Sequence, residues 1–250
     1  MSDVQRDVAL PDLVAEGYEL DALVSAQADW SKDTPAVGWT IAHQIAHLAS
    51  ADANVLIAIR TPEAFDAVLK HAETLGPQYR DIDAAEGAAL PRAELLEQWR
   101  AGRIEVAAAL RDIPLDQPFP WYGSELTAKL AVPLRLMETW AHGQDIFDTL
   151  GVTRHATSRL RPIASMGVAG RELSFYTAEL PTPAEPFRVE LTGPDGTIWA
   201  WGPADAEQRV QGSALDFGLR VTQRRTLAET DLTAVGADAQ KWLDIARIFL

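Results

Sequence analysis

The sequence lacks cysteine entirely and has only five histidines among its 250 residues. Without cysteine the chain has no disulfide, no thiolate metal ligand and no cysteine nucleophile. Any metal must therefore be bound through nitrogen and oxygen atoms, and any thiol chemistry must use a small-molecule thiol. This absence directs attention to histidine and carboxylate side chains.

Positive charge is also scarce, since 22 Lys and Arg stand against 36 Asp and Glu, for a net charge of -14. Such a field repels phosphate backbones and anionic lipid surfaces over about a Debye length. No segment approaches the roughly 20 uninterrupted apolar residues of a spanning helix, and the first residues lack the pattern of a secretory signal. We therefore expect a cytoplasmic monomer or homodimer whose partners are small molecules rather than nucleic acid or membrane.

The first 150 residues carry the apolar spacing of long helices. Four such segments are predicted, over residues 10–30, 41–60, 91–112 and about 125–150. Pro11 is placed near a helix start, Thr40 is predicted to be an N-cap, and Gly151 is predicted to end the fourth helix. A short helix over 62–76 and a loop or short helix over 81–87 lie between them. We expect a four-helix bundle over residues 1–152.

The stretch 113–124 is too rich in proline and glycine for regular structure, so it is predicted to be a loop. It carries Trp121 and Tyr122, which are candidates for substrate contact, although packing is the commoner role of aromatic side chains beside such a loop.

Residues 153–250 have a different sequence pattern from the long helical segments that precede them. A connecting helix is predicted over about 158–178, followed by the short strands FRVEL, TIWAWG and QRVQG, the first two joined by the turn GPDG. SALDFGLRVTQRR and DAQKWLDIARIFL are predicted to be helical. The chain is therefore predicted to have an α+β fold, a helical bundle followed by a smaller α+β domain.

A possible metal site lies in the fourth predicted helix. Glu138 and His142 are four residues apart, about 6 Å along a helix, and project from the same face. Apolar residues border this face, so the carboxylate is expected inside the bundle, where it needs a compensating charge. His47, on the apolar face of the second helix, is the natural third ligand, and such a three-ligand set leaves positions open as catalytic zinc prefers.

Other interpretations remain open at this point. Glu138 and His142 alone would often be a surface pair, and a lone histidine is more often a packed residue than a ligand. His43 could be a fourth ligand, or could have a supporting or partly exposed role. Asp145 and Asp52 could orient a ligand imidazole or be solvated. A di-iron site requires two Glu-x-x-His pairs, which this chain does not offer.

The segments GWTIAHQIAHLA and LMETWAHGQDIFDTLG, about ninety residues apart, resemble the DinB-like metal-binding bundle of the actinobacterial mycothiol-dependent maleylpyruvate isomerase family. The resemblance implies that His47, Glu138 and His142 are the metal ligands and that His43 is not. ALDFGLRVTQRR resembles the helix of that family's C-terminal domain, in which Asp216 precedes Arg224 by eight residues. Arg224 then corresponds to an arginine proposed to face the active site, so it is the predicted catalytic residue.

The expected function is that of an enzyme that requires a divalent metal, zinc fitting the donors best, and a low-molecular-weight thiol such as mycothiol. It would isomerise a small electrophilic substrate or transfer the thiol to it, with Arg224 or Arg225 compensating substrate carboxylates. Two alternatives stay open: a metal-dependent hydrolase that needs no thiol, and a non-catalytic protein that binds a metal or another ligand.

Overall fold

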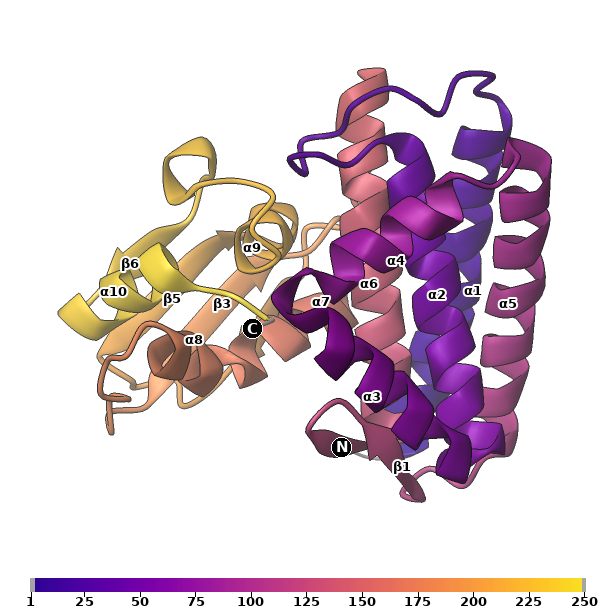
Figure 1. Cartoon of the computed structure of the whole chain (residues 1–250). Helices are drawn as coiled ribbons and strands as arrows, with labels where there is room; N and C mark the ends of the chain where they lie inside the picture. Colours follow the sequence, from indigo (N-terminus) through magenta and orange to yellow (C-terminus); the bar gives the residue numbers. More distant parts are fainter. Residues whose placement is uncertain (1–2, 249–250) are drawn as a thin grey trace. The chain divides into compact units, whose positions relative to one another are not determined.

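The chain divides into two compact units, Met1–Thr153 and Arg154–Leu250, in a computed structural model that describes residues 3–248 (Figure 1). The first is helical and the second combines helices with a sheet, which confirms the predicted α+β class. The sequence places the boundary after residue 152. Within the described residues, no helix has the length and apolar character needed to cross a membrane.

Four long helices build the bundle of the first unit: α1 (Asp3–Ser25), α2 (Ile41–Arg60), α5 (Arg92–Asp112) and α6 (Ala128–Leu150). α1 packs on α5 and α6, and α2 packs on the same two helices from the other side of the core. The buried side chains include Trp99, Leu48 and Leu136. Two shorter helices, α3 (Phe65–Leu75) and α4 (Tyr79–Ala88), follow the 3₁₀ turns Pro62–Ala64 and Gly76–Gln78.

The predicted helix ends are confirmed in part. The first helix ends at Ser25 and not near residue 30, and the fourth begins at Ala128 and not near residue 125. Thr40 is the N-cap of α2, and Gly151 ends α6 in a left-handed conformation with φ 64°. α1, however, begins at Asp3, so Pro11 lies inside the helix and not at its start. Proline inside a helix removes one backbone donor and crowds the preceding turn, and the packing of α1 on α5 and α6 offsets this cost.

α4 lies close against α2 because of a glycine. A Cβ atom at Gly87 would stand 2.8 Å from the Cβ of Ala46, closer than two carbon atoms can pack. Gly87 therefore allows the close approach that brings the first turn of α4 to the face of α2 from which His47 projects.

The predicted loop over residues 113–124 is wrong in part, because a hairpin forms there: β1 (Pro118–Trp121) pairs antiparallel with β2 (Ser124–Thr127). Hydrogen-bonded and non-hydrogen-bonded pairs alternate in such a ribbon, so Pro118 and Pro120, two residues apart, both take positions that need no donor. Gly123, with φ 67°, completes the two-residue turn.

The second unit contains a four-stranded sheet in the order β4-β3-β5-β6. Its strands are β3 (Phe187–Thr192), β4 (Ile198–Trp201), β5 (Gln208–Ser213) and β6 (Thr233–Val235). β3 pairs antiparallel with β4, as predicted, but parallel with β5. The helices α9 (Ala214–Val221) and α10 (Ala237–Ile245) pack on the sheet, and the buried Trp242 meets Phe187 and Phe217 edge to face.

Three helix predictions in this unit need correction. The one over residues 238–250 ends at Ile245, and residues 249–250 lie outside the described residues. The single helix predicted over about 158–178 is two helices, α7 (Leu160–Ala169) and α8 (Arg171–Thr177), separated at Gly170, a residue of low helix propensity. The helix predicted through residue 225 ends at Val221. Gln223 adopts φ 63°, and the Arg224 N–H bonds to the Leu219 carbonyl at 2.8 Å, which is the hydrogen bond of a Schellman end.

Candidate metal centre

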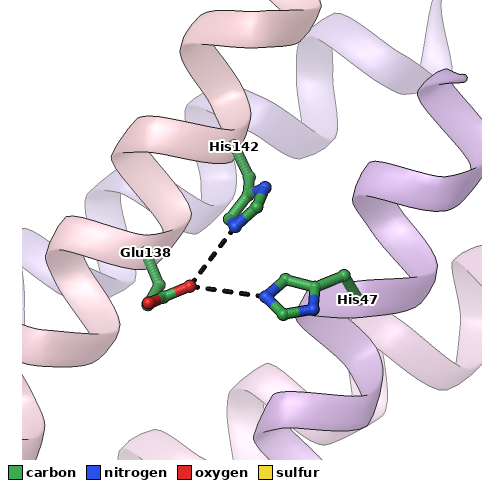
Figure 2. A group of neighbouring side chains, drawn as sticks. All are labelled: His47, Glu138 and His142. Atoms are coloured by element: carbon green, nitrogen blue, oxygen red, sulfur yellow. Dashed lines mark hydrogen bonds and ion pairs between the residues drawn. The ribbon is translucent and has the colours of Figure 1, made fainter. Parts of the chain in front are cut away.

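Three side chains from two helices converge in the bundle: His47 from α2, and Glu138 and His142 from α6 (Figure 2). The Oε2 atom of Glu138 lies 3.4 Å from His47 Nε2 and 3.3 Å from His142 Nε2. The three ligand atoms are all within 4.8 Å of one another. One carboxylate oxygen and two imidazole nitrogens therefore face a common point.

The cluster is enclosed but still reachable. The side chains of His47, Glu138 and His142 are 16%, 18% and 14% exposed, whereas neighbouring residues of α6 such as Met137 and Ala141 are completely buried. A ligand could therefore reach the three donors from one side. Closed structural zinc sites offer no such access, whereas catalytic sites keep an open position.

A chain of hydrogen bonds orients His142. The Thr34 hydroxyl donates to the carbonyl of Trp39 at 2.8 Å, so its oxygen must accept the bond from Gln44 Nε2 at 2.9 Å. This fixes the amide of Gln44, whose Oε1 lies 2.6 Å from His142 Nδ1. Since Oε1 only accepts, Nδ1 carries a proton, and in the neutral form of the ring Nε2 presents its lone pair to Glu138.

Glu138 is held as a carboxylate. Burial alone would raise its pKa, but hydrogen bonds from the His142 and His47 imidazoles, in the states in which their Nε2 atoms carry protons, outweigh that effect and keep the pKa well below its usual value. When His142 is neutral with its proton on Nδ1, its Nε2 lone pair faces the carboxylate oxygen, and a cation between the two atoms removes the repulsion. The donors therefore fit a divalent ion, and two nitrogens with one oxygen match the preference of zinc.

Trp39 packs against both imidazole rings. Its ring is stacked on His142 with centroids 5.8 Å apart and is tilted against His47 at 5.3 Å. The indole N–H donates to the carboxylate of Asp81, in the first turn of α4, at 2.8 Å. Trp39 thereby restrains the two rings and covers them on one side.

The other polar candidates near the cluster have partners of their own. His43 is the third residue of α2, and its Nδ1 lies 2.8 Å from the Thr40 hydroxyl, so it caps the helix and is not among the three converging ligands. Asp52 is buried and pairs with Arg135 at 2.9 Å. Asp145 is 3% exposed, which excludes the solvated position considered for it.

The two aromatic candidates for substrate contact differ in their surroundings. Trp121 stacks on the buried Phe65 with ring centroids 5.7 Å apart, as a packing residue would. Tyr122 accepts a hydrogen bond from Asn54 at 3.0 Å, and Asn54 lies on α2 seven residues after His47, on the same helix face. A substrate-binding role for either residue stays a prediction.

Arg224 belongs to the second unit, where it follows α9. Its guanidinium donates to the carbonyl of Thr222 at 2.7 Å, and it lines a cavity of about 410 Å³ together with Arg225 and Glu229. Its proposed catalytic role stays a prediction.

Sequence reasoning missed Trp39 and Gln44, although both lie in the stretch that drew attention to His47. Gln44 is three residues before His47 and fully buried, and a buried amide inside an otherwise apolar helix face signals a polar partner. Trp39 lies just before the N-cap residue of α2, outside the helix, so helical periodicity does not predict where its side chain points.

Comparisons with known proteins agree with this architecture. Residues 13–147 match the family described as Mycothiol maleylpyruvate isomerase N-terminal domain, and residues 183–235 match the one described as Wyosine base formation. Uncharacterized proteins from two strains of Mycobacterium tuberculosis, CDC 1551 / Oshkosh and ATCC 25618 / H37Rv, are each 51% identical over 241 residues, which is 95% of this chain and 93% of theirs.

Two crystal structures share the fold, those of the mycothiol-dependent maleylpyruvate isomerase and of a histidine-to-alanine mutant. Each has a TM-score of 0.62 and 16% sequence identity, with 92% of both chains covered. The family match covers more than half of the chain and includes all three converging residues, as the resemblance of the two histidine-bearing segments implied. The chain therefore belongs to the mycothiol maleylpyruvate isomerase N-terminal domain family.

Proposed function

We propose that this protein is an enzyme that binds a divalent metal, zinc by preference, and uses a low-molecular-weight thiol, mycothiol, to isomerise a small electrophilic substrate. The observation that carries the proposal is the convergence of His47, Glu138 and His142 on one point in a member of this family. The absence of cysteine supports an external thiol, because the chain has none of its own.

The residues of the cluster would have distinct tasks. His47, Glu138 and His142 would hold the ion, and the carboxylate of Glu138 would reduce its net charge to one. Gln44 would keep the proton of His142 on Nδ1, so that the lone pair of Nε2 is available to bind the metal ion. Trp39 would exclude water from one side of the two rings.

When bound, the ion would lower the pKa of a thiol, as zinc does for water, and make a thiolate available near neutral pH. The thiol would supply reversible addition to a carbon–carbon double bond, which permits rotation from a cis to a trans isomer. The protein's part is to bind and orient the reactants, and none of its own side chains needs to act as the nucleophile.

Turnover of maleylpyruvate tests this proposal directly. Zinc-loaded protein is expected to isomerise it only when mycothiol is present, and Glu138→Gln is expected to lose at least about a thousandfold in rate, equal to roughly 4 kcal/mol. Glu105→Gln, which changes an exposed glutamate paired with Arg60, is the matched control and should keep full activity. Equal turnover without a thiol would instead support the hydrolase, and would overturn the proposal.

The non-catalytic alternative makes a different prediction about stability. If the ion chiefly holds the bundle together, His47→Ala would unfold the first unit. We expect a folded variant that has lost metal and turnover, because the apolar core around α2 does not depend on this side chain. Comparing the thermal melting of His47→Ala with that of the parent distinguishes a structural role of the ion from a catalytic one.

A further inference from the structure

The first turn of α4 flanks the histidine–carboxylate cluster with three consecutive side chains. Tyr79 packs against Tyr122, with ring centroids 5.7 Å apart, and Asp81 holds the Trp39 that covers His142. Arg80 stands between them in the sequence, and the negative charge of Glu138 acts on its guanidinium. The first turn of α4 therefore brings a positive charge to the rim of the site.

Arg80 differs from the other arginines of the first unit. Every other arginine whose side chain is described there binds a carboxylate or a backbone carbonyl, namely Arg60, Arg92, Arg100, Arg103, Arg111 and Arg135. The Arg80 Nε donates to the Tyr79 hydroxyl at 3.0 Å, and its two terminal nitrogens have no hydrogen-bond partner within residues 3–248. These nitrogens are the pair that binds a carboxylate in the two-point manner typical of arginine.

Neighbouring groups hold this guanidinium in place and keep it charged. It lies over the ring of Tyr79, 5.5 Å from the centroid, and Tyr79 is in turn packed on Tyr122. Burial would lower the pKa of Arg80, but the Tyr79 hydroxyl and the charges of Tyr79 and Glu138 raise it overall. Since Asn54 also anchors Tyr122 to α2, the chain Asn54–Tyr122–Tyr79–Arg80 connects the guanidinium to the helix that bears His47.

Tyr122 supports Tyr79 in this wall, because the two side chains are hydrogen-bonded to each other. Burial, followed by the effect of Tyr79, raises its pKa, so the phenol keeps its proton throughout the physiological range. The acidic groups nearby are already engaged, since Asp81 accepts from Trp39 and Asp83 pairs with His71 at 3.1 Å. Among these groups the terminal nitrogens of Arg80 are therefore the donors that remain available, which favours an anion.

We propose that Arg80 is the residue that receives a carboxylate of the substrate, which is held by one end at α4 while its reacting end faces His47, Glu138 and His142. The inference rests on the proposed function and deepens it. With a net charge of -14, the protein as a whole repels such an acid, so a local cation without an internal partner is needed to bind it.

Binding of maleate, an unreactive cis-dicarboxylate, to the zinc-loaded protein tests the assignment by isothermal titration without turnover. We expect Arg80→Gln to weaken maleate binding at least about tenfold, Arg80→Lys to recover part of it, and Arg60→Gln, the matched control at an exposed ion pair, to bind like the parent. Zinc content should be equal in all four proteins, and the neutral dimethyl ester of maleate should not distinguish Arg80→Gln from the parent.

The kinetic signature should agree with the binding result. In the thiol-dependent reaction Arg80→Gln is expected to raise KM more than it lowers kcat, because it removes a contact made before and during the chemical step. Equal maleate affinity of Arg80→Gln and the parent, or no maleate binding by the parent, overturns the assignment even if thiol-dependent isomerisation stands. Arg80-dependent maleate binding without any thiol dependence would overturn the proposed reaction and leave the carboxylate site intact.

Discussion

Two charged clusters bridge the same pair of helices, α2 and α6, and they are completed in different ways. Asp52 of α2 pairs with Arg135 of α6 at 2.9 Å, and the two side chains are only 7% and 3% exposed. One turn further along α6, Glu138 meets two imidazoles and no fixed cation, and these side chains are 14–18% exposed. The first cluster is paired and closed, whereas the second is open, and within residues 3–248 no lysine or arginine forms an ion pair with Glu138.

The difference distinguishes the charged groups that stabilise the bundle from those that are available to bind a ligand. A guanidinium beside a buried carboxylate satisfies it permanently, although burial still raises the pKa of Asp52 above its usual value. Beside Glu138 there is no such fixed partner, and the two imidazole nitrogens and the carboxylate oxygen face a common point. The first cluster therefore stabilises the fold, whereas the second is arranged to bind a cation, as proposed above.

The largest expected effect is on stability, and it comes from removing the carboxylate of the closed cluster. Asp52→Leu leaves Arg135 buried without its carboxylate, and should lower the free energy of unfolding by about 3–5 kcal/mol. The double variant with Arg135→Met should recover most of this loss, because both charges are then gone. Urea unfolding of the two variants and the parent measures the effect, and a double variant no more stable than Asp52→Leu would show that the charge pair is not the cause.

A second closed cluster, between α1 and α5, extends the comparison to pH. Asp21 is contacted by Arg100 at 2.6 Å and Arg103 at 2.7 Å; burial opposes their effect, yet its pKa falls from 3.8 to about 2. Because the folded pKa is depressed, Asp21 contributes its full stability above about pH 4 and loses it as the pH falls towards 2.

Asp21→Asn should therefore lower the free energy of unfolding by about 2 kcal/mol at pH 7. The difference from the parent should shrink below pH 4 and vanish near pH 2. Denaturation curves at pH 7, 4 and 2 measure it, with the exposed Asp66→Asn as a control that changes stability by less than about 0.5 kcal/mol. A difference independent of pH would contradict the ion-pair explanation.

The smallest effect is expected from the hydrogen bond that orients the open cluster. Gln44→Leu removes the acceptor for the Nδ1 proton of His142 and should weaken zinc binding about tenfold, with little change in the fold. Competition with a zinc chelator gives the affinity, and Gln98→Leu, at an exposed position of α5, is the matched control. Unchanged affinity in Gln44→Leu would show that His142 needs no such orientation.

The sequence predicted those parts of the fold and site that depend on local spacing. Glu138 and His142 share a face because they are four residues apart on a helix, and the apolar pattern around His47 directs it inward. The α+β class and the family follow from similarly local signals and are confirmed. The role of the three residues as metal ligands stays a prediction.

What the sequence could not predict depends on contacts between distant segments. The position of Arg80 depends on the packing of α4 against α2, which Gly87 permits, and nothing in the spacing of residues 79–88 indicates this. The hairpin around Trp121 was not predicted, because prolines are rare in regular structure. Pro118 and Pro120 both occupy strand positions that donate no hydrogen bond to β2. The left-handed Gln223 follows the end of a helix that the sequence predicted through residue 225.

Elemental analysis of the purified protein tests the central claim most directly. The parent, prepared without chelators, is expected to carry about one divalent ion per chain, and Glu138→Gln should lose it while keeping the helical content of the parent. Asp52→Leu with Arg135→Met, which alters the neighbouring closed cluster, should retain the ion. A parent without stoichiometric metal, or a Glu138→Gln variant that still holds a full equivalent, would contradict the account.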